Sequence, residues 1–173
     1  MINLLTDKKI IEYSDLKRLR NKFDKAGLNT VFTSGCFDLL HLGHIVHLNY
    51  CKSQGDVLIV SVGNDKLIKK LKGNSRPILD EETRLRTVAA LDCVDYVVLS
   101  QESDNGCFDH KIMVQLLIPD IYIINNNDKA LEDKKQMVNG YGGKFITCVR
   151  VPPENLKNGI STTEIIDKIR SLK

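Results

Sequence analysis

The sequence predicts a doubly wound α/β fold, in which a parallel sheet of about five strands carries helices on both faces. Short apolar runs alternate along the chain with segments of helical periodicity, as in successive βαβ units. The run 56–62 is almost continuously apolar, which indicates a strand buried on both faces of a parallel sheet. The 173 residues suffice for one substantial core, so we expect a single Rossmann-like domain over 1–173.

Each element of this fold can be assigned to a stretch of the chain. The strands are expected at 30–33, 56–62, 96–99, 121–124 and 144–148. The helices are expected at 14–25, 42–52, 81–91, 111–117, 129–139 and 162–171. Ser14 is the expected cap of the first helix and Gly27 its end, so residues 1–28 form an N-terminal helical segment before a core at 29–173. The lysine-rich stretch after Asp65 is expected to be a loop.

Composition and charge narrow the class of partner. The formal net charge is +3, with charges of both signs interspersed, so small anions are expected as partners rather than nucleic acid. No apolar run approaches the roughly 20 residues that span a bilayer, and the polar start lacks a secretory leader, which predicts a cytoplasmic protein without a membrane partner. The five cysteines lack zinc-site spacing, so we expect reduced thiols and no metal held by the protein.

The first junction between strand and helix carries the strongest chemical signal. Ligands of doubly wound sheets bind beyond the carboxyl ends of the strands, which points to the loops after the first, second and fourth expected strands. His41-Leu-Gly-His44 opens a helix in the first of these loops, so two imidazoles and free backbone amides can hold an anion there. Histidines at a helix start often only cap or pack, but the flanking glycines favour the anion site. His47 has no suitably spaced cysteine for a zinc site and is interpreted as wall or surface.

Two further stretches offer donors to the same anion. Five basic side chains crowd a short stretch after the second strand: Lys66, Lys69, Lys70, Lys72 and Arg76. Such crowding is costly unless a polyanion such as a triphosphate neutralises it, although a solvated surface is the other interpretation. Before the last helix, the run 159–163 places hydroxyls and free amides where Ser161 or Thr162 can both cap the helix and face a phosphate.

The run Thr33-Ser-Gly-Cys-Phe-Asp-Leu-Leu-His-Leu-Gly-His44 resembles the signature of the cytidylyltransferase-like nucleotidyltransferases, the group that holds glycerol-3-phosphate cytidylyltransferase and heptose-1-phosphate adenylyltransferase. Similar stretches of the heptose branch recur here in the same order: 69–73, 76–77, 141–143 and 160–166. The resemblance covers nearly the whole chain. It implies transfer of a nucleoside monophosphate from a nucleoside triphosphate, ATP or CTP, to a small phosphorylated acceptor, with Mg²⁺ bound through the triphosphate.

The resemblance also implies roles for single residues. His41 and His44 are the expected transition-state donors, and Lys72, with Lys69 second, is the expected catalytic lysine. The expected nucleotide-binding residues are Ser34, Gly35, Cys36, Phe37, Gly43, Asp65, Asn127, Asp128, Gly159, Ile160, Ser161, Thr162 and Thr163. The candidates for holding the acceptor or bracing the site are Lys70, Arg84 and Lys111.

Two departures from the family pattern leave the substrates open. Leu156 stands where glycerol-3-phosphate cytidylyltransferases have an arginine, and either Asn127 or Asp128 takes the place of an acidic residue after the fourth strand. The leading hypothesis is a sugar-1-phosphate nucleotidyltransferase of the heptose type. A cytidylyltransferase for glycerol-3-phosphate or another small alcohol phosphate is the alternative, and a regulatory protein that binds nucleotide without turnover is the hypothesis of another class. A homodimer is expected by resemblance.

Overall fold

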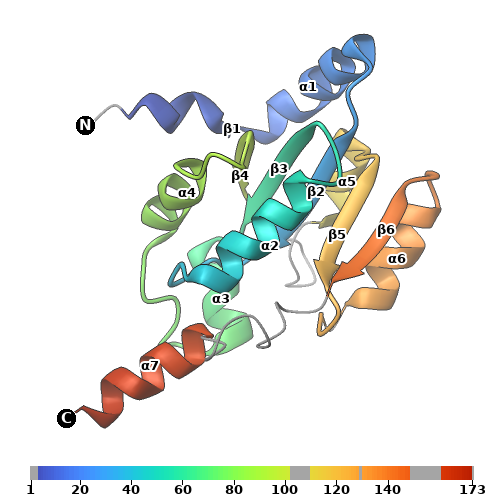
Figure 1. Cartoon of the computed structure of the whole chain (residues 1–173). Coiled ribbons are helices and arrows are strands. Elements are labelled where there is room, and N and C mark those ends of the chain that lie inside the picture. The colour runs from blue at the N-terminus through green and yellow to red at the C-terminus, as the bar shows by residue number, and fades with distance from the viewer. Residues whose placement is uncertain (1–3, 102–109, 129, 149–160, 173) are drawn as a thin grey trace.

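The computed structural model describes residues 4–101, 110–128, 130–148 and 161–172, and the strands in this part of the chain form one parallel sheet (Figure 1). Its order is β1-β4-β3-β2-β5-β6. The strands are β1 (Ile10–Ile11), β2 (Thr30–Gly35), β3 (Val57–Val62), β4 (Tyr96–Leu99), β5 (Ile121–Asn125) and β6 (Lys144–Cys148). The helices are η1 (Leu5–Lys9), α1 (Tyr13–Ala26), α2 (Leu42–Lys52), α3 (Asp65–Lys72), α4 (Glu81–Ala89), α5 (His110–Leu117), α6 (Leu131–Asn139) and α7 (Thr162–Ser171).

The structure confirms the α/β class and the five expected strands, and it adds a sixth at the edge of the sheet. Strand β1 pairs in parallel with β4, with Ile10 opposite Val97. Two residues are too short to show any periodicity, so the sequence analysis missed this strand. The N-terminal segment is therefore not purely helical, because it supplies the outermost strand. Gly27 ends α1 with a φ of 65°, as expected, but Glu12 and not Ser14 occupies the cap position.

The stretch after Asp65 is a helix, so the prediction of a loop was wrong. Helix α3 begins after Asn64, whose side chain accepts a hydrogen bond from the Leu67 amide at 2.8 Å. Leu67 and Ile68 are buried and form a narrow apolar face. Lysine is a good helix former, so this lysine-rich stretch forms an amphipathic helix rather than a loop.

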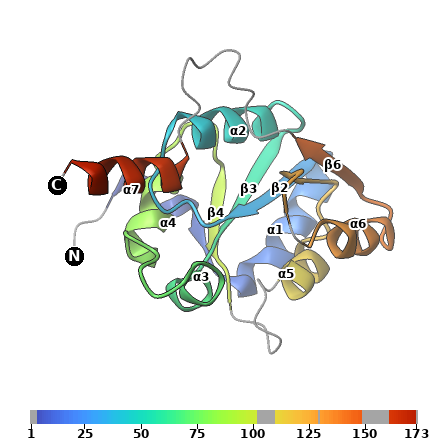
Figure 2. The same ribbon diagram turned by 90° about the horizontal axis from the view of Figure 1, so that it is seen from below.

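Two cores cover the two faces of the sheet. One face packs apolar side chains of α2 and α4, among them Leu48, Cys51 and Val88, against β2, β3 and β4. The other face packs α1, α5 and α6 against the sheet, with Leu16 and Leu117 wholly or almost wholly buried. Figure 2 shows α2 on one side of the strands and α1, α5 and α6 on the other. The doubly wound prediction is thus confirmed.

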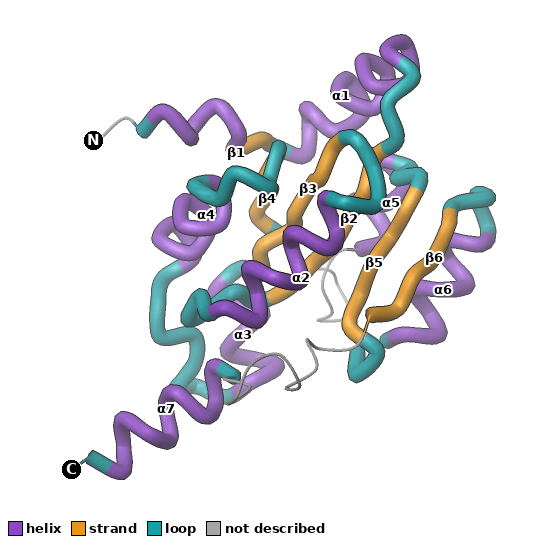
Figure 3. Tube along the Cα trace, viewed as in Figure 1, coloured by secondary structure: helices purple, strands orange, loops and turns teal. Residues whose placement is uncertain are grey.

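The strand order reverses direction at β2, which has β3 on one side and β5 on the other. Each strand is joined to the next strand along the chain through one or more helices, as the trace in Figure 3 shows. At the amino ends of β2 and β5, the Asp120 carboxylate accepts hydrogen bonds from the Thr30 amide at 2.7 Å and from Arg20 Nη1 at 2.8 Å. The two strands are therefore tied together at this end, and the ligand crevice of the fold is expected at the opposite, carboxyl end.

Within the described residues, no helix combines the length and apolar character needed to cross a membrane.

Candidate functional site

Two stacked imidazoles stand at the start of α2, beyond the carboxyl end of β2. The ring centroids of His41 and His44 are 3.9 Å apart, with an angle of 35° between the planes. His41 occupies the cap position, and its Nδ1 accepts a hydrogen bond from the Gly43 amide at 3.1 Å. That bond requires an unprotonated Nδ1, so a neutral His41 carries its proton on Nε2.

The loop before this helix is tightly folded around an aromatic ring. Phe37 has a φ of 47°, in the left-handed region, and is buried. A Cβ on Gly35 would lie 3.0 Å from the Phe37 ring, closer than an ordinary van der Waals contact, so a larger residue here would press against that ring. The same ring lies 5.4 Å from that of His44, measured between centroids. The Phe37 ring therefore packs beside His44 of the histidine pair.

Three separate parts of the chain contact this loop, at Cys36, Asp38 and Leu39. Arg84 of α4 donates from Nη1 to the carbonyl of Cys36 at 2.6 Å. The carboxylate of Asp38 accepts a hydrogen bond from the Ile78 amide at 2.7 Å. Thr162 of α7 lies with its hydroxyl 3.4 Å from the carbonyl oxygen of Leu39. The segment that joins α3 to α4, helix α4 itself and the terminal helix thus converge on one loop.

Arg84 is the central support of this arrangement. Its side chain has no exposed surface, and its other guanidinium nitrogens donate to the Leu79 carbonyl at 2.9 Å and to Asp65 Oδ1 at 2.8 Å. Sequence analysis expected Arg84 either to hold the acceptor or to brace the site, and its burial favours the bracing role. Asp65, an expected nucleotide-binding residue, has its carboxylate engaged by this arginine at the first residue of α3.

The lysines of α3 divide into two groups by their helical positions. Lys69 and Lys72 follow Asp65 by four and seven residues, so they share its side of the helix, while Lys70 lies on another side. All three are exposed. Burial raises the pKa of the Cys36 thiol, and the positive charges of Lys72, Arg84 and Arg76 oppose this rise. Lys72 therefore lies within electrostatic reach of the histidine loop.

Other expected nucleotide-binding residues lie at the carboxyl ends of β2 and β5. The Ser34 hydroxyl lies 3.2 Å from the hydroxyl of Tyr122, which links β2 to β5. Asp128 accepts hydrogen bonds from the Ala130 amide at 2.9 Å and from Lys134 Nζ at 2.6 Å. The carboxylate of Asp128 is thus occupied within the protein, whereas Asn127 is exposed in the turn after β5.

The terminal motif is described only in part. Ser161 caps α7, as expected, by accepting a hydrogen bond from the Glu164 amide at 3.2 Å, and Thr163 is exposed. The expected contacts at Gly159 and Ile160 lie outside the described residues. Lys111 is exposed in the first turn of α5, and no contact in the described part of the chain joins it to the histidine loop.

His47 belongs to a cluster that the sequence analysis did not foresee. Its Nε2 lies 3.1 Å from the Thr33 hydroxyl and 3.5 Å from Cys51 Sγ, and its Nδ1 lies 3.2 Å from Cys148 Sγ. The two thiols thus approach different ring nitrogens. Within the described ranges, no group of three histidine, cysteine or acidic side chains could hold a metal ion. His47 therefore joins α2 to β2 and β6, as part of the wall.

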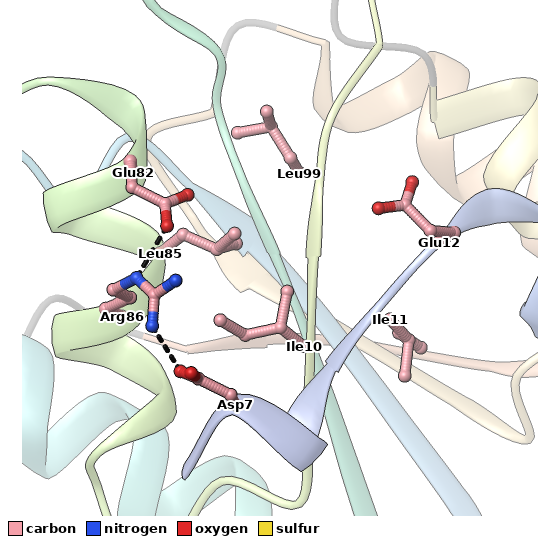
Figure 4. A pocket seen from close by; sticks show the side chains of 8 residues that line it. All are labelled: Asp7, Ile10, Ile11, Glu12, Glu82, Leu85, Arg86 and Leu99. Atoms are coloured by element: carbon pink, nitrogen blue, oxygen red, sulfur yellow. Dashed lines mark hydrogen bonds and ion pairs between the residues drawn. The ribbon is translucent and has the colours of Figure 1, made fainter. Parts of the chain in front are cut away.

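A cavity of about 360 Å³ lies away from this site, at the edge of the sheet. Figure 4 shows Arg86 between Asp7 and Glu82 on one side of the cavity, with Ile10 and Leu99 beside it. The lining comes from η1, β1, α4 and β4 and includes none of the expected site residues.

The chain belongs to the cytidylyltransferase-like family, whose model matches residues 32–168. Among curated relatives, it is 38% identical over 167 residues to the bifunctional protein HldE of Geobacter metallireducens and 38% identical over 156 residues to that of Helicobacter pylori. These matches take in 95% and 90% of this chain but only 31% and 30% of the relatives. The chain thus spans about a third of the length of the curated relatives it matches.

Two solved structures share the fold of this chain. The lipopolysaccharide core biosynthesis protein of Thermoplasma volcanium is 31% identical, with a TM-score of 0.62 over 73% of this chain and 100% of its own. The pantoate-beta-alanine ligase of Francisella tularensis, at 19% identity and a TM-score of 0.60 over 94% of this chain and 77% of its own, shares the fold.

The bracing role of Arg84 can be tested through stability. We expect Arg84→Met to lower the free energy of unfolding by about 3 kcal/mol, because buried acceptors lose their donor and Asp65 loses its cation. Urea denaturation followed by circular dichroism measures this change. The matched control is Arg18→Met. The Arg18 side chain is 70% exposed, so this change should lower the free energy of unfolding by no more than about 0.5 kcal/mol. Equal midpoints for the two variants would show that Arg84 is not a brace.

His47 makes stability depend on pH. Burial lowers the pKa of His47, so the folded state resists a proton that the unfolded chain accepts near its ordinary pKa of about 6.5. Its contribution is therefore complete above that pH and declines as the pH falls below it. We expect the melting temperature to fall less in His47→Gln than in the wild type between about pH 7.5 and pH 5.5. An equal fall in the melting temperature of both proteins over this pH range would contradict the prediction.

Proposed function

We propose that this chain is a nucleotidyltransferase, which transfers a nucleoside monophosphate from a nucleoside triphosphate to a sugar 1-phosphate of the heptose type and releases pyrophosphate. The observation that carries the proposal is the stacked pair His41 and His44 at the amide end of α2, with Lys72 within electrostatic reach of the same loop. The heptose type is supported by the similarity to HldE proteins and to a lipopolysaccharide core biosynthesis protein.

In the proposed reaction, a phosphate oxygen of the acceptor forms a bond to the α-phosphorus, and the bond from that phosphorus to the bridging oxygen of the β-phosphate breaks. Pyrophosphate leaves with the electron pair of that bond. The acceptor phosphate is already ionised near neutral pH, so no residue has to remove a proton from it. The protein then contributes positioning and charge stabilisation, as in other phosphoryl transfers.

The side chains of the site suit this division of work. His41 Nε2 can donate to a non-bridging oxygen whose charge grows in the transition state, and His44 stacks beside it on the same turn. The amides at the start of α2 favour the same charge. Lys72, with Lys69 second, faces the leaving pyrophosphate. Mg²⁺ bound to the triphosphate would neutralise part of its charge, held by phosphate oxygens rather than by a ligand cluster of the described residues.

ATP is proposed before CTP as the nucleotide, because the chain resembles the heptose-1-phosphate adenylyltransferase branch of the family. Asn127 is exposed beyond β5 and is proposed to contact the nucleotide there. We also propose a homodimer in the cytoplasm, in line with the resemblance.

The histidine pair can be tested by substitution. We expect His44→Ala to lower turnover by ~10² or more, by analogy with the loss of one oxyanion donor, while the variant stays folded. Pyrophosphate release measures turnover, and circular dichroism checks the fold. His47→Gln also removes an imidazole from α2 but lies outside the proposed machinery, so it should retain turnover within about threefold. Near-normal turnover of a folded His44→Ala enzyme would exclude the mechanism.

The substrates can be identified by a matrix of assays. ATP, CTP and GTP would each be combined with heptose 1-phosphate, other sugar 1-phosphates and glycerol-3-phosphate, and pyrophosphate release would be measured with Mg²⁺. We expect the highest kcat/KM for ATP with a sugar 1-phosphate. A preference for CTP with glycerol-3-phosphate would favour the cytidylyltransferase alternative. Nucleotide binding without pyrophosphate release from any pair would favour a regulatory protein and overturn the proposed activity.

A further inference from the structure

A buried ion pair lies directly beside the histidine loop. The sequence analysis named Arg76 only as one of five basic side chains near an expected polyanion, and it gave Asp38 no role. Arg76 donates from Nε to one carboxylate oxygen of Asp38. The other oxygen accepts hydrogen bonds from the amides of Ile78 at 2.7 Å and Leu79 at 3.1 Å. The Asp38 side chain is 1% exposed and that of Arg76 is 15% exposed. The carboxylate thus fixes both the guanidinium and the backbone that follows it.

A buried carboxylate is unexpected beside a site for a polyanion, because its negative charge opposes the ligand. Its three donors offset that charge. Its effect on Arg76 explains its presence, since a guanidinium held through Nε keeps its plane and the direction of its remaining N–H groups. A fixed fork of donors matches the oxygens of a phosphate group.

The two arginines of this region use their donors differently. Arg84 has no exposed surface and bonds through all three of its nitrogens to Cys36, Leu79 and Asp65. Arg76 is partly exposed, and in the described part of the chain its side chain bonds only to Asp38 and only through Nε. Its terminal nitrogens therefore remain available for a ligand.

Arg76 also lies near Cys36, which is in the same loop as Asp38. Its charge acts on the Cys36 thiol together with the charge of Lys72, as the causes of the pKa shift of Cys36 show. Arg76 and Lys72 thus approach the loop that ends in the histidine pair. Both belong to the region around α3 and its following segment, which Arg84 and Asp38 anchor to the loop.

We propose that Arg76 binds a substrate phosphate group through its terminal nitrogens, and that Asp38 is a positioning residue that sets the direction of this guanidinium. The inference rests on the proposed nucleotidyltransferase activity, which supplies two sources of that group. One is the triphosphate of the nucleotide, and the other is the phosphate of the acceptor.

The test compares Arg76→Lys, Arg76→Met and Asp38→Asn with the wild type and with Arg18→Gln, a distant, exposed arginine as the control for charge. We expect Arg76→Met to raise the KM of one phosphate-bearing substrate by about tenfold or more, and Arg76→Lys to recover little of this loss, because a lysine keeps the charge but not the fork. A raised KM for the nucleotide alone identifies the triphosphate as the source, and a raised KM for the acceptor alone identifies its phosphate. Arg18→Gln should match the wild type.

The role of Asp38 is tested in combination. If Asp38 acts through Arg76, Asp38→Asn should raise the same KM as Arg76→Met and should add less than about twofold when the two changes are combined. Independent, multiplying effects would show that Asp38 only stabilises the fold. Melting temperatures report folding for every variant.

Binding of inorganic tripolyphosphate, measured by titration calorimetry, separates this inference from the proposed activity. Weaker binding by folded Arg76→Lys supports the role of Arg76 even if the wild type shows no turnover with any substrate pair. Unchanged tripolyphosphate binding, together with both KM values within twofold of the wild type, overturns the inference while leaving the activity of the wild type intact.

Discussion

One buried guanidinium holds the parts of the candidate site at fixed distances from one another. Arg84 bonds to the carbonyl of Cys36, to the carbonyl of Leu79 and to the carboxylate of Asp65. These acceptors belong to the loop after β2, to the segment before α4 and to the first turn of α3. Because the guanidinium is planar and rigid, moving any one of the three would break a buried hydrogen bond. The lysine helix is therefore kept beside the histidine pair.

The charges around this loop are arranged so that its surface stays positive. Asp65 and Asp38 bring negative charge close to the loop, but each is engaged by an arginine, Arg84 and Arg76 respectively. Lys72 adds a further positive charge within reach of Cys36. A site that transfers a nucleotidyl group depends on such preorganised donors more than on a nucleophile or base of the protein. Asp38 and Asp65 thus hold the guanidinium groups of Arg76 and Arg84 in place.

The carboxyl end of β5 is stabilised by a different kind of contact. The turn after β5 uses its own side chains: Asn125 Oδ1 accepts a hydrogen bond from the Asn127 amide at 3.1 Å, and Asp128 bonds to Lys134. Polar side chains of this turn therefore maintain its backbone path. Of the two candidates for the acidic place, Asp128 is engaged within the protein and Asn127 faces solvent, so substrate preference on this side is expected to depend on Asn127.

The sequence by itself determined the fold class, five of the strands and the place of the histidine pair, because these depend on local periodicity and on the order of strands and helices. His41-Leu-Gly-His44 could be placed at a helix start and interpreted as an anion site, since a helix start and its amides are local features. The strand Ile10–Ile11 and the helix Asp65–Lys72 could not be recognised, because the first exists only through pairing with β4 and the second has a narrow apolar face among lysines. Only the tertiary structure decided which polar side chains are fully engaged within the described part of the chain and which are not. Arg76 and Arg84 are both arginines near one loop, and they differ in the number of buried acceptors that segments distant in sequence place around each guanidinium.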